Sequence, residues 1–262
     1  MSTSVVSSIS RMGTIEPFEL QLSRGQITGH KLVTISGYNP DIDTTWESLI
    51  PSGGFIAYPA TAVQMKVSSS SASDTAAGVG ARTVTITGLD GNWNELSETV
   101  TLNGQTTVLT TSLFFRVNGL SVASAGTSLA NVGDIYFGNG VVTAGVPATI
   151  YDMIPAGFNN RQTHAYSVPA GYTGYIVAAR FVMAQSAGAD IVWARLTTTN
   201  SDNIKRSAAV AQLNNGVLPL TISMPIPVPE KTTIAGEGLG NAANNFCSSL
   251  FQIVLISNNG QA

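Results

Sequence analysis

Charged side chains are scarce in this sequence. Asp, Glu, Lys and Arg make up 10% of its 262 residues, whereas about 25% is usual in soluble domains. Small and polar residues fill the deficit, and no stretch reaches the roughly 20 apolar residues of a membrane helix. Because the cores of protein interfaces are depleted in charge, the composition indicates that much of the surface faces other protein. It predicts no membrane partner.

The charge balance excludes a second class of partner. The net charge is −3 at pH 7, with an isoelectric point near 5.3, and the basic residues form no stripe along the chain. A nucleic-acid-binding surface needs clustered Lys and Arg to neutralise phosphates. We therefore expect no nucleic-acid partner.

Cysteine and histidine are also rare. Cys247 is the only cysteine, so the chain cannot form an intrachain disulfide or a Cys/His metal cluster, and its apolar neighbours predict a buried, inert thiol. The only histidines, His30 and His164, lie far apart, and no G-x-S-x-G elbow accompanies them. We expect both histidines at the surface. The sequence predicts no catalytic residue, no metal ligand and no cofactor.

Helical periodicity is missing, whereas short runs of alternating apolar residues recur between Gly, Asn, Ser and Asp turns. This pattern is typical of antiparallel β-sandwiches and jelly rolls. We predict an all-β protein with an extended N-terminal arm over residues 1–58, a first β-sandwich over 59–150 and a second, jelly-roll-like sandwich over 151–262. The Ser-rich start lacks the basic-then-apolar layout of a secretion signal, so none is expected.

Three segments are less regular. Pro225, Pro227 and Pro229 each remove a ladder donor, which predicts an edge or crossover strand. Lys205–Leu213 fits a short helix or a strand, and Trp46–Ile50 fits one helical turn or an extended anchor.

The stretch from Asp90 to Glu95 has two interpretations. Its Asp, Asn and Glu side chains suit calcium, but a helix-flanked calcium loop needs Gly at its sixth position and Glu at its twelfth. Counted from Asp90, those positions hold Glu95 and Thr101, and the flanking residues alternate with the period of a strand. We therefore favour the tip of a β-hairpin, where any ion would be weakly held.

Other candidate chemistry is weaker. Asp41, Asp43 and Glu47 cluster in the sequence, as the carboxylates of a glycosidase site would, but they stand among turn formers, where Asp is favoured for local hydrogen bonding. The glycines of Asp74–Arg82 resemble a phosphate loop that lacks the Gly-Lys-Ser/Thr ending. A strand rather than a helix follows them, so we interpret the segment as a mobile β-loop.

Aromatic and basic residues allow both functional and structural interpretations. Tyr172, Tyr175 and Trp193 would either line a sugar platform or pack in a core or subunit interface, and we favour packing. Arginines within strands, such as Arg116 and Arg180, are expected to pair with carboxylates or with backbone carbonyls across an interface.

Several blocks of the sequence, in order, resemble a known group of proteins. They are EPFELQLSRGQITGH, SSSSASDTAAGVGARTVTITGLDGNWNELSETVTLNGQTTVLTT, FFRVNGLSVASAG with NVGDIYFG, and HAYSVPAGYTGYI. These blocks are similar to virion structural proteins of tailed phages, particularly marine and cyanobacterial ones, over nearly the whole chain. The resemblance implies a β-sandwich or jelly-roll protein assembled on the particle, and it implies no catalytic residue.

Two functions from different classes are therefore expected. The first is a non-enzymatic building block of a phage particle, either a capsid decoration protein or a tail or collar component. It would clasp the major capsid protein or tail subunits through its arm and sheet edges, as a trimer or ring, and its location would be the virion after assembly in the host cytoplasm. The alternative is a receptor- or glycan-binding tail module, with weak depolymerase activity less favoured.

Overall fold

The computed structural model describes residues 10–11, 14–185, 188, 190–214, 216–220 and 222–260. The fold is nearly all β, with 58% strand and 3% helix, which confirms the predicted class. Every strand pairing in the described ranges is antiparallel. None of the helices among these residues is long and apolar enough to cross a bilayer.

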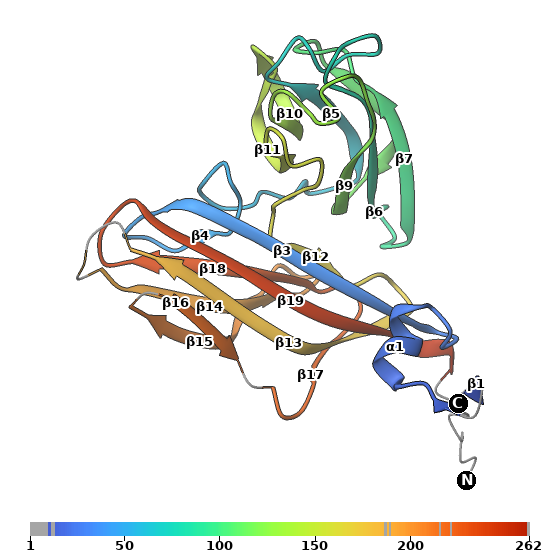
Figure 1. The fold of residues 1–262 in the computed structure, drawn as a ribbon, viewed down its shortest axis with the longest axis vertical. Helices are drawn as coiled ribbons and strands as arrows, with labels where there is room; N and C mark the ends of the chain where they lie inside the picture. Colours follow the sequence, from blue (N-terminus) through green and yellow to red (C-terminus); the bar gives the residue numbers. More distant parts are fainter. Residues whose placement is uncertain are drawn as a thin grey trace.

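Two β units, each with its own apolar core, make up the fold (Figure 1). The first unit forms a four-stranded sheet, β11-β10-β5-β8, and a three-stranded sheet, β7-β6-β9. Its strands are β5 (Val63–Ser69), β6 (Ala81–Leu89), β7 (Glu95–Thr101), β8 (Val108–Phe114), β9 (Arg116–Ala125), β10 (Ile135–Thr143) and β11 (Val146–Ile154).

Both sheets of the first unit contribute to one core. Phe114 and Phe137 from the larger sheet pack edge to face, with ring centroids 5.5 Å apart. Val84 and Ile86 reach the same core from β6. The alternation of apolar residues along β6 therefore has a direct cause, because successive side chains of a strand point to opposite faces.

The second unit is built from strands that come from both ends of the chain. They are β3 (His30–Ile42), β4 (Glu47–Ser48), β12 (Ala165–Ser167), β13 (Tyr172–Ala184), β14 (Val192–Thr199), β15 (Lys205–Leu213), β16 (Gly216–Leu220), β17 (Ile226–Val228), β18 (Thr233–Gly240) and β19 (Asn245–Ser257). One sheet has the order β12-β18-β14-β15, with β4 beside β18, and the other has the order β16-β13-β19-β3, with β17 beside β13. A 3₁₀ turn, Asn258–Gly260, follows β19.

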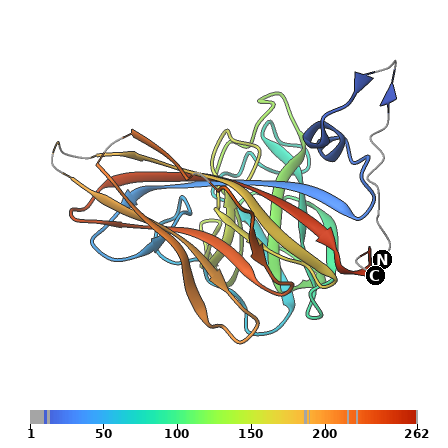
Figure 2. The same ribbon diagram turned by 90° about the horizontal axis from the view of Figure 1, so that it is seen from below.

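Short elements precede the second unit. They are β1 (Ser10–Arg11), β2 (Thr14–Ile15) and the helix α1 (Phe18–Ser23). Figures 1 and 2 place these elements beside the sheets of the second unit rather than within them.

The N-terminal arm is shorter than predicted. β3 pairs with β19 along its length, and Ile35, Ile42 and Leu49 are buried in the second core. The prediction of an arm over residues 1–58 is therefore wrong from residue 30 onward. The short apolar alternation of this segment does predict a strand, but its partner lies at the far end of the chain, where local patterns give no signal.

Three local expectations have clear outcomes. Lys205–Leu213, for which helix and strand were both open, is strand β15. The segment around Trp46 is extended, because it contains β4. Pro227 lies in β17, and among the described residues β17 pairs with β13 alone. The expected edge position is therefore confirmed for this proline.

Phe251 is a central residue of the second core, and its replacement tests that core. Its fully buried ring packs edge-on against His164 at 4.2 Å and Phe181 at 5.5 Å between ring centroids. Phe251→Ala should lower the free energy of unfolding by about 3–5 kcal/mol, because it removes buried contacts and leaves a cavity. Urea unfolding followed by circular dichroism measures this loss.

The matched control for this experiment is Val217→Ala. Val217 is 59% exposed, so its truncation should change the free energy of unfolding by no more than about 0.5 kcal/mol. Equal effects of the two substitutions would contradict the assignment of Phe251 to the core.

Candidate functional site in the cleft between the two units

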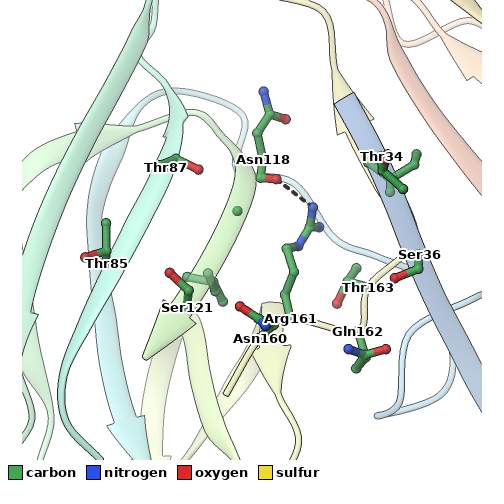
Figure 3. A pocket seen from close by; sticks show the side chains of 13 residues that line it. Thr34, Ser36, Thr85, Thr87, Asn118, Ser121, Asn160, Arg161, Gln162 and Thr163 are labelled. Atoms are coloured by element: carbon green, nitrogen blue, oxygen red, sulfur yellow. Dashed lines mark hydrogen bonds between the residues drawn. The ribbon is translucent and has the colours of Figure 1, made fainter. Parts of the chain in front are cut away.

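A cleft of about 400 Å³ lies between the two β units. β3 forms one wall, β6 and β9 form the other, and the connecting residues 160–163 lie between them (Figure 3). Hydroxyl and amide groups dominate the lining. The polar side chains are Thr34, Ser36, Thr85, Thr87, Asn118, Ser121, Asn160, Arg161, Gln162 and Thr163.

Strand alternation explains why this lining is polar. Val84 and Ile86 of β6 point into the first core, so Thr85 and Thr87 face the cleft. The same alternation along β3 supplies hydroxyl groups to the opposite wall. The sequence predicts which residues share a face of each strand, but it does not show that the two faces meet.

Arg161 bridges the two units. Its Nε lies 2.6 Å from Oδ2 of Asp152, and its Nη1 donates to the backbone oxygens of Asn118 and Ala165, each at 2.9 Å. Burial raises the pKa of the Asp152 carboxyl, and the Arg161 guanidinium opposes that shift. The only charged residue of the lining is therefore already compensated, so the cleft suits a neutral, hydroxyl-rich ligand better than an ion.

Arg116, the first residue of β9, packs its guanidinium among three aromatic rings. Its guanidinium carbon lies 3.9 Å from the ring centroid of Phe115, 4.6 Å from that of Tyr58 and 5.0 Å from that of Trp93. Its Nη1 also donates to the oxygen of the adjacent residue, Phe115, at 2.9 Å, and this local contact does not test the expected pairing across an interface. Burial lowers the pKa of Arg116 and raises the pKa of Tyr58 to about 12. The three rings around Arg116 hold the segment near Tyr58 against the first unit.

The two histidines differ in their surroundings. His164 is fully buried, so its expected surface position is wrong, whereas the His30 ring contacts the Thr28 oxygen at the start of β3. Room for the His164 ring exists because residues 37 and 236 are glycines. A Cβ on Gly37 would lie 2.8 Å from the His164 Cβ, and one on Gly236 would lie 2.9 Å from Nδ1.

The predicted hairpin at Asp90–Glu95 is confirmed. β6 and β7 pair from Leu89 opposite Glu95, and the Asp90 carboxylate accepts hydrogen bonds from the backbone N–H groups of Asn92 at 2.8 Å and Asn94 at 2.9 Å. Slight burial acts to raise the pKa of Asp90, but these hydrogen bonds outweigh it and hold the pKa below its usual value. The Glu95 carboxylate pairs instead with Lys31 at 2.5 Å, so the two acids do not converge on an ion.

Asp41 near the end of β3 and Asp43 after it lie close to Glu47. Burial raises the pKa of Glu47, and the nearby Asp43 and Asp41 carboxylates act in the same direction, against a hydrogen bond from Asn39 Nδ2 to Oε2 at 2.9 Å. Across the described ranges, no group of three or more His, Cys, Asp or Glu side chains has a geometry that could hold a metal ion.

Asp74 is a structural residue that sequence analysis missed. Its carboxylate is fully buried and accepts hydrogen bonds from the backbone N–H groups of Ala81, Val132 and Gly133 at 2.7–2.9 Å. The loop 74–82 therefore encloses the protein's own anion, where a phosphate loop would enclose a ligand. The glycine at position 80 was the one sign of this contact in the sequence. Any larger residue there would clash, because a Cβ on Gly80 would lie 2.1 Å from Oδ1 of Asp74.

The aromatic residues proposed for a sugar platform are not brought together. Tyr172 and Tyr175 lie on β13, and Trp193 lies on β14 of the other sheet. Tyr172 also packs partly against the second core, and the Lys31 ammonium lies 4.6 Å from its ring centroid.

Glu237 is a second buried acid, after Asp74, whose structural role sequence analysis missed. Its buried carboxylate accepts from Arg195 Nη2 and Lys205 Nζ, each at 2.5 Å. The Trp46 ring centroid lies 3.9 Å from the Arg195 guanidinium carbon, and the Phe55 centroid lies 4.8 Å from Lys205 Nζ. The contacts attach the segment after β3 to β14 and β15 of the second unit.

No protein-family model and no curated protein matches the chain. Among solved structures, the chain has weak similarity to the VP2 subviral particle of infectious bursal disease virus, with 12% identity, 88% of this chain and 73% of that chain covered, and a TM-score of 0.24. The Gx strain of the same virus gives 12% identity, coverages of 94% and 79%, and a TM-score of 0.26. Similarity this low supports no conclusion about fold or function.

The buried His164 should make stability depend on pH. Burial, with the Arg161 charge in the same direction, lowers the pKa of His164 to about 3, whereas about 6.5 is usual for an unfolded chain. Between these values the unfolded chain binds a proton that the folded chain excludes. The free energy of unfolding should therefore fall by about 2–3 kcal/mol on acidification from pH 7 to about pH 4.5.

Urea unfolding at both pH values measures this dependence. His164→Gln should reduce the fall, and His30→Gln, its matched control, should leave the fall unchanged. The same fall in the His164→Gln variant as in the wild type would contradict this assignment.

Proposed function

We propose that this chain is a non-enzymatic structural protein of a virus particle, and more narrowly of a tailed bacteriophage. It clasps neighbouring subunits on the capsid surface, as a decoration or cement protein, or at the tail or collar. The ordered blocks that resemble phage virion proteins support this proposal, as does the low content of charged residues, 10%. The location is the virion, after assembly in the host cytoplasm.

The observation that carries this proposal is the exposure of two large apolar side chains of α1, Phe18 and Leu20. Leu22 is buried beneath the helix, but Phe18 and Leu20 are 46% and 47% exposed. A helix of six residues is far too short to be stable without packing. A neighbouring subunit that covers Phe18 and Leu20 would supply that packing, and it would give the arm its anchoring role.

A second uncovered surface lies at the loop end of the first unit. Val79, Leu129 and Phe158 are 51%, 79% and 49% exposed. Their loops are joined by hydrogen bonds from Ser128 N to the Val79 oxygen at 2.9 Å and from Asn159 Nδ2 to the Leu129 oxygen at 3.0 Å. Exposed apolar patches of this kind mark contacts with other protein. We assign them to other virion proteins, such as the major capsid protein or tail and collar subunits, and to further copies of this chain in a trimer or ring.

The proposed domain organisation follows the two cores. An arm extends to residue 29, β5–β11 form the first β-sandwich, and β3, β4 and β12–β19 form the second, jelly-roll-like sandwich. In each unit, both sheets contribute buried residues to one apolar cluster. This shared core supports the division of the chain into two sandwiches.

The cleft supports a second candidate function, a receptor- or glycan-binding module. Its many hydroxyl and amide groups offer paired donors and acceptors, and its single guanidinium is compensated by Asp152. Such a lining suits a neutral sugar. The proposed role in the particle does not require this binding.

The arm can be tested without disturbing either core. Phe18→Ser/Leu20→Ser changes two exposed side chains, so the free energy of unfolding should stay within about 0.5 kcal/mol of the wild type. Each side chain would contribute about 1.5–3 kcal/mol when covered by a neighbour, so the amount of variant in purified particles should fall at least tenfold, as about 1.4 kcal/mol corresponds to tenfold. Quantitative mass spectrometry of the particles measures it.

Val141→Ser is the matched control, because Val141 is 75% exposed at the β10–β11 hairpin, away from the arm. It should enter particles at the wild-type level. Normal incorporation of the Phe18→Ser/Leu20→Ser variant would refute the clasping role of the arm, and absence of the wild-type chain from particles would refute the proposed function.

The glycan-binding candidate has a separate test. Thr87→Trp should fill the cleft and abolish any binding seen on a glycan array, whereas Thr101→Trp on β7, outside the cleft, should preserve it. Lack of binding by the wild type, or binding unchanged by Thr87→Trp, would eliminate this candidate.

A further inference from the structure

The outer edge of β15 is open. This strand pairs with β14 on one side, and in the part of the chain that the structure describes no strand pairs with its other side. Most of its side chains are exposed, including Val210 at 58%. An open edge presents unpaired N–H and C=O groups to any extended strand of suitable shape.

Side chains block two other sheet edges. At β8, the Glu98 carboxylate accepts from the backbone N–H groups of Thr111 at 2.7 Å and Ser112 at 2.8 Å. At β12, the Asn118 amide accepts from Ser167 N at 2.8 Å and donates to the Ser167 oxygen at 2.9 Å. Both edges have partners from within the chain.

The remaining edges of the two units are protected in other ways. Prolines interrupt the donors of β11, β16, β17 and β3, at Pro147, Pro219, Pro227 and Pro40. β9 is covered, because Val122 N donates to the Asn159 oxygen at 2.8 Å. β7 carries Glu95 and Glu98. Such features are the usual means by which proteins prevent edge-to-edge pairing.

Only the first half of β15 has comparable protection. Lys205 and Arg206 begin the strand, and the register with β14 shifts before Ala209. The second half, Ala209–Leu213, is regular, uncharged and free of proline. This half is therefore a segment of sheet edge, within the described residues, where another strand can add without meeting a proline, a charged side chain or a covering loop.

An apolar groove lies beside Ala209, the first residue of this half. A groove of about 370 Å³ opens between the two sheets beside it, lined by Ala209, Ile222, Met224 and Ile226 among others. Met224 is 79% exposed. β15 and β16 are edge strands of opposite sheets that follow one another in the chain (Figure 1). An added strand would thus bury apolar surface as well as satisfy backbone groups.

We propose that β15 pairs antiparallel with β15 of a second copy of this chain, about a two-fold axis. The sheet β12-β18-β14-β15 then continues across two subunits. This inference rests on the proposed function and deepens it, because it names one contact between particle subunits.

Charge along the strand selects a second copy in this orientation. An antiparallel pair centred on Ala211 uses all of Ala209–Leu213 and sets Val210 opposite Gln212 in both halves. Lys205 and Arg206 then lie beyond the uncharged half of the partner strand. A parallel pair would set these two basic residues beside their own copies, which is unfavourable.

The experiment uses two variants of the full chain that differ only at position 212. In Val210→Lys/Gln212→Lys, lysines face each other twice across the seam, so the dissociation constant should rise about tenfold or more. In Val210→Lys/Gln212→Glu, each lysine faces a glutamate of the other copy, and association should remain within about threefold of the wild type. Sedimentation velocity measures the molar mass, and circular dichroism checks that both variants melt like the wild type.

The wild type should sediment as a dimer or a multiple of one at micromolar concentration, and the double-lysine variant should have at most half its mass. A monomeric wild type, two variants that both stay associated or two that both dissociate would each overturn the proposed pairing. Mass spectrometry of particles tests the proposed function separately. Wild-type chain found in particles together with any of these three results would refute the β15 contact alone.

Discussion

The pairing of β3 with β19 is the constraint on which the rest of the structure depends. These strands come from opposite ends of the described chain and lie side by side over eleven matched residue pairs. β19 also pairs with β13, and its Phe251, Ile253 and Leu255 fill the second core. The pairing therefore fixes the position of one sheet, of the core beneath it and of the β3 wall of the cleft. It also makes the first unit an insertion between β4 and β12.

A chain with few charges uses several of them inside the protein. Asp74 organises the loops of the first unit, Asp152 holds Arg161 between the units, and Glu237 joins Arg195 and Lys205. An isolated buried carboxylate would cost several kcal/mol, so each of the three depends on its set of donors. These anchors leave even less charge for the surface, which is consistent with a surface that contacts protein.

Local patterns in the sequence predicted the fold class and several details. The alternation at Val84–Thr87 identified the residues that face the core, and the turn formers after Leu89 identified the hairpin. Both features depend on residues close together in the chain. The burial of His164 and the aromatic contacts of Arg116 could not be predicted in this way, because Gly37, Gly236, Tyr58 and Trp93 come from distant segments.

The place of β19 at the end of the described chain also sets an order of events during synthesis. All strands of the first unit lie within residues 63–154, so this unit has its complete set of partners while the ribosome is still adding the later strands. β3 emerges early but has to wait for residues 245–257 before its ladder can form, and such distant pairing is slow. The half-made protein thus leaves the β3 edge that pairs with β19 unpaired until residues 245–257 have been added.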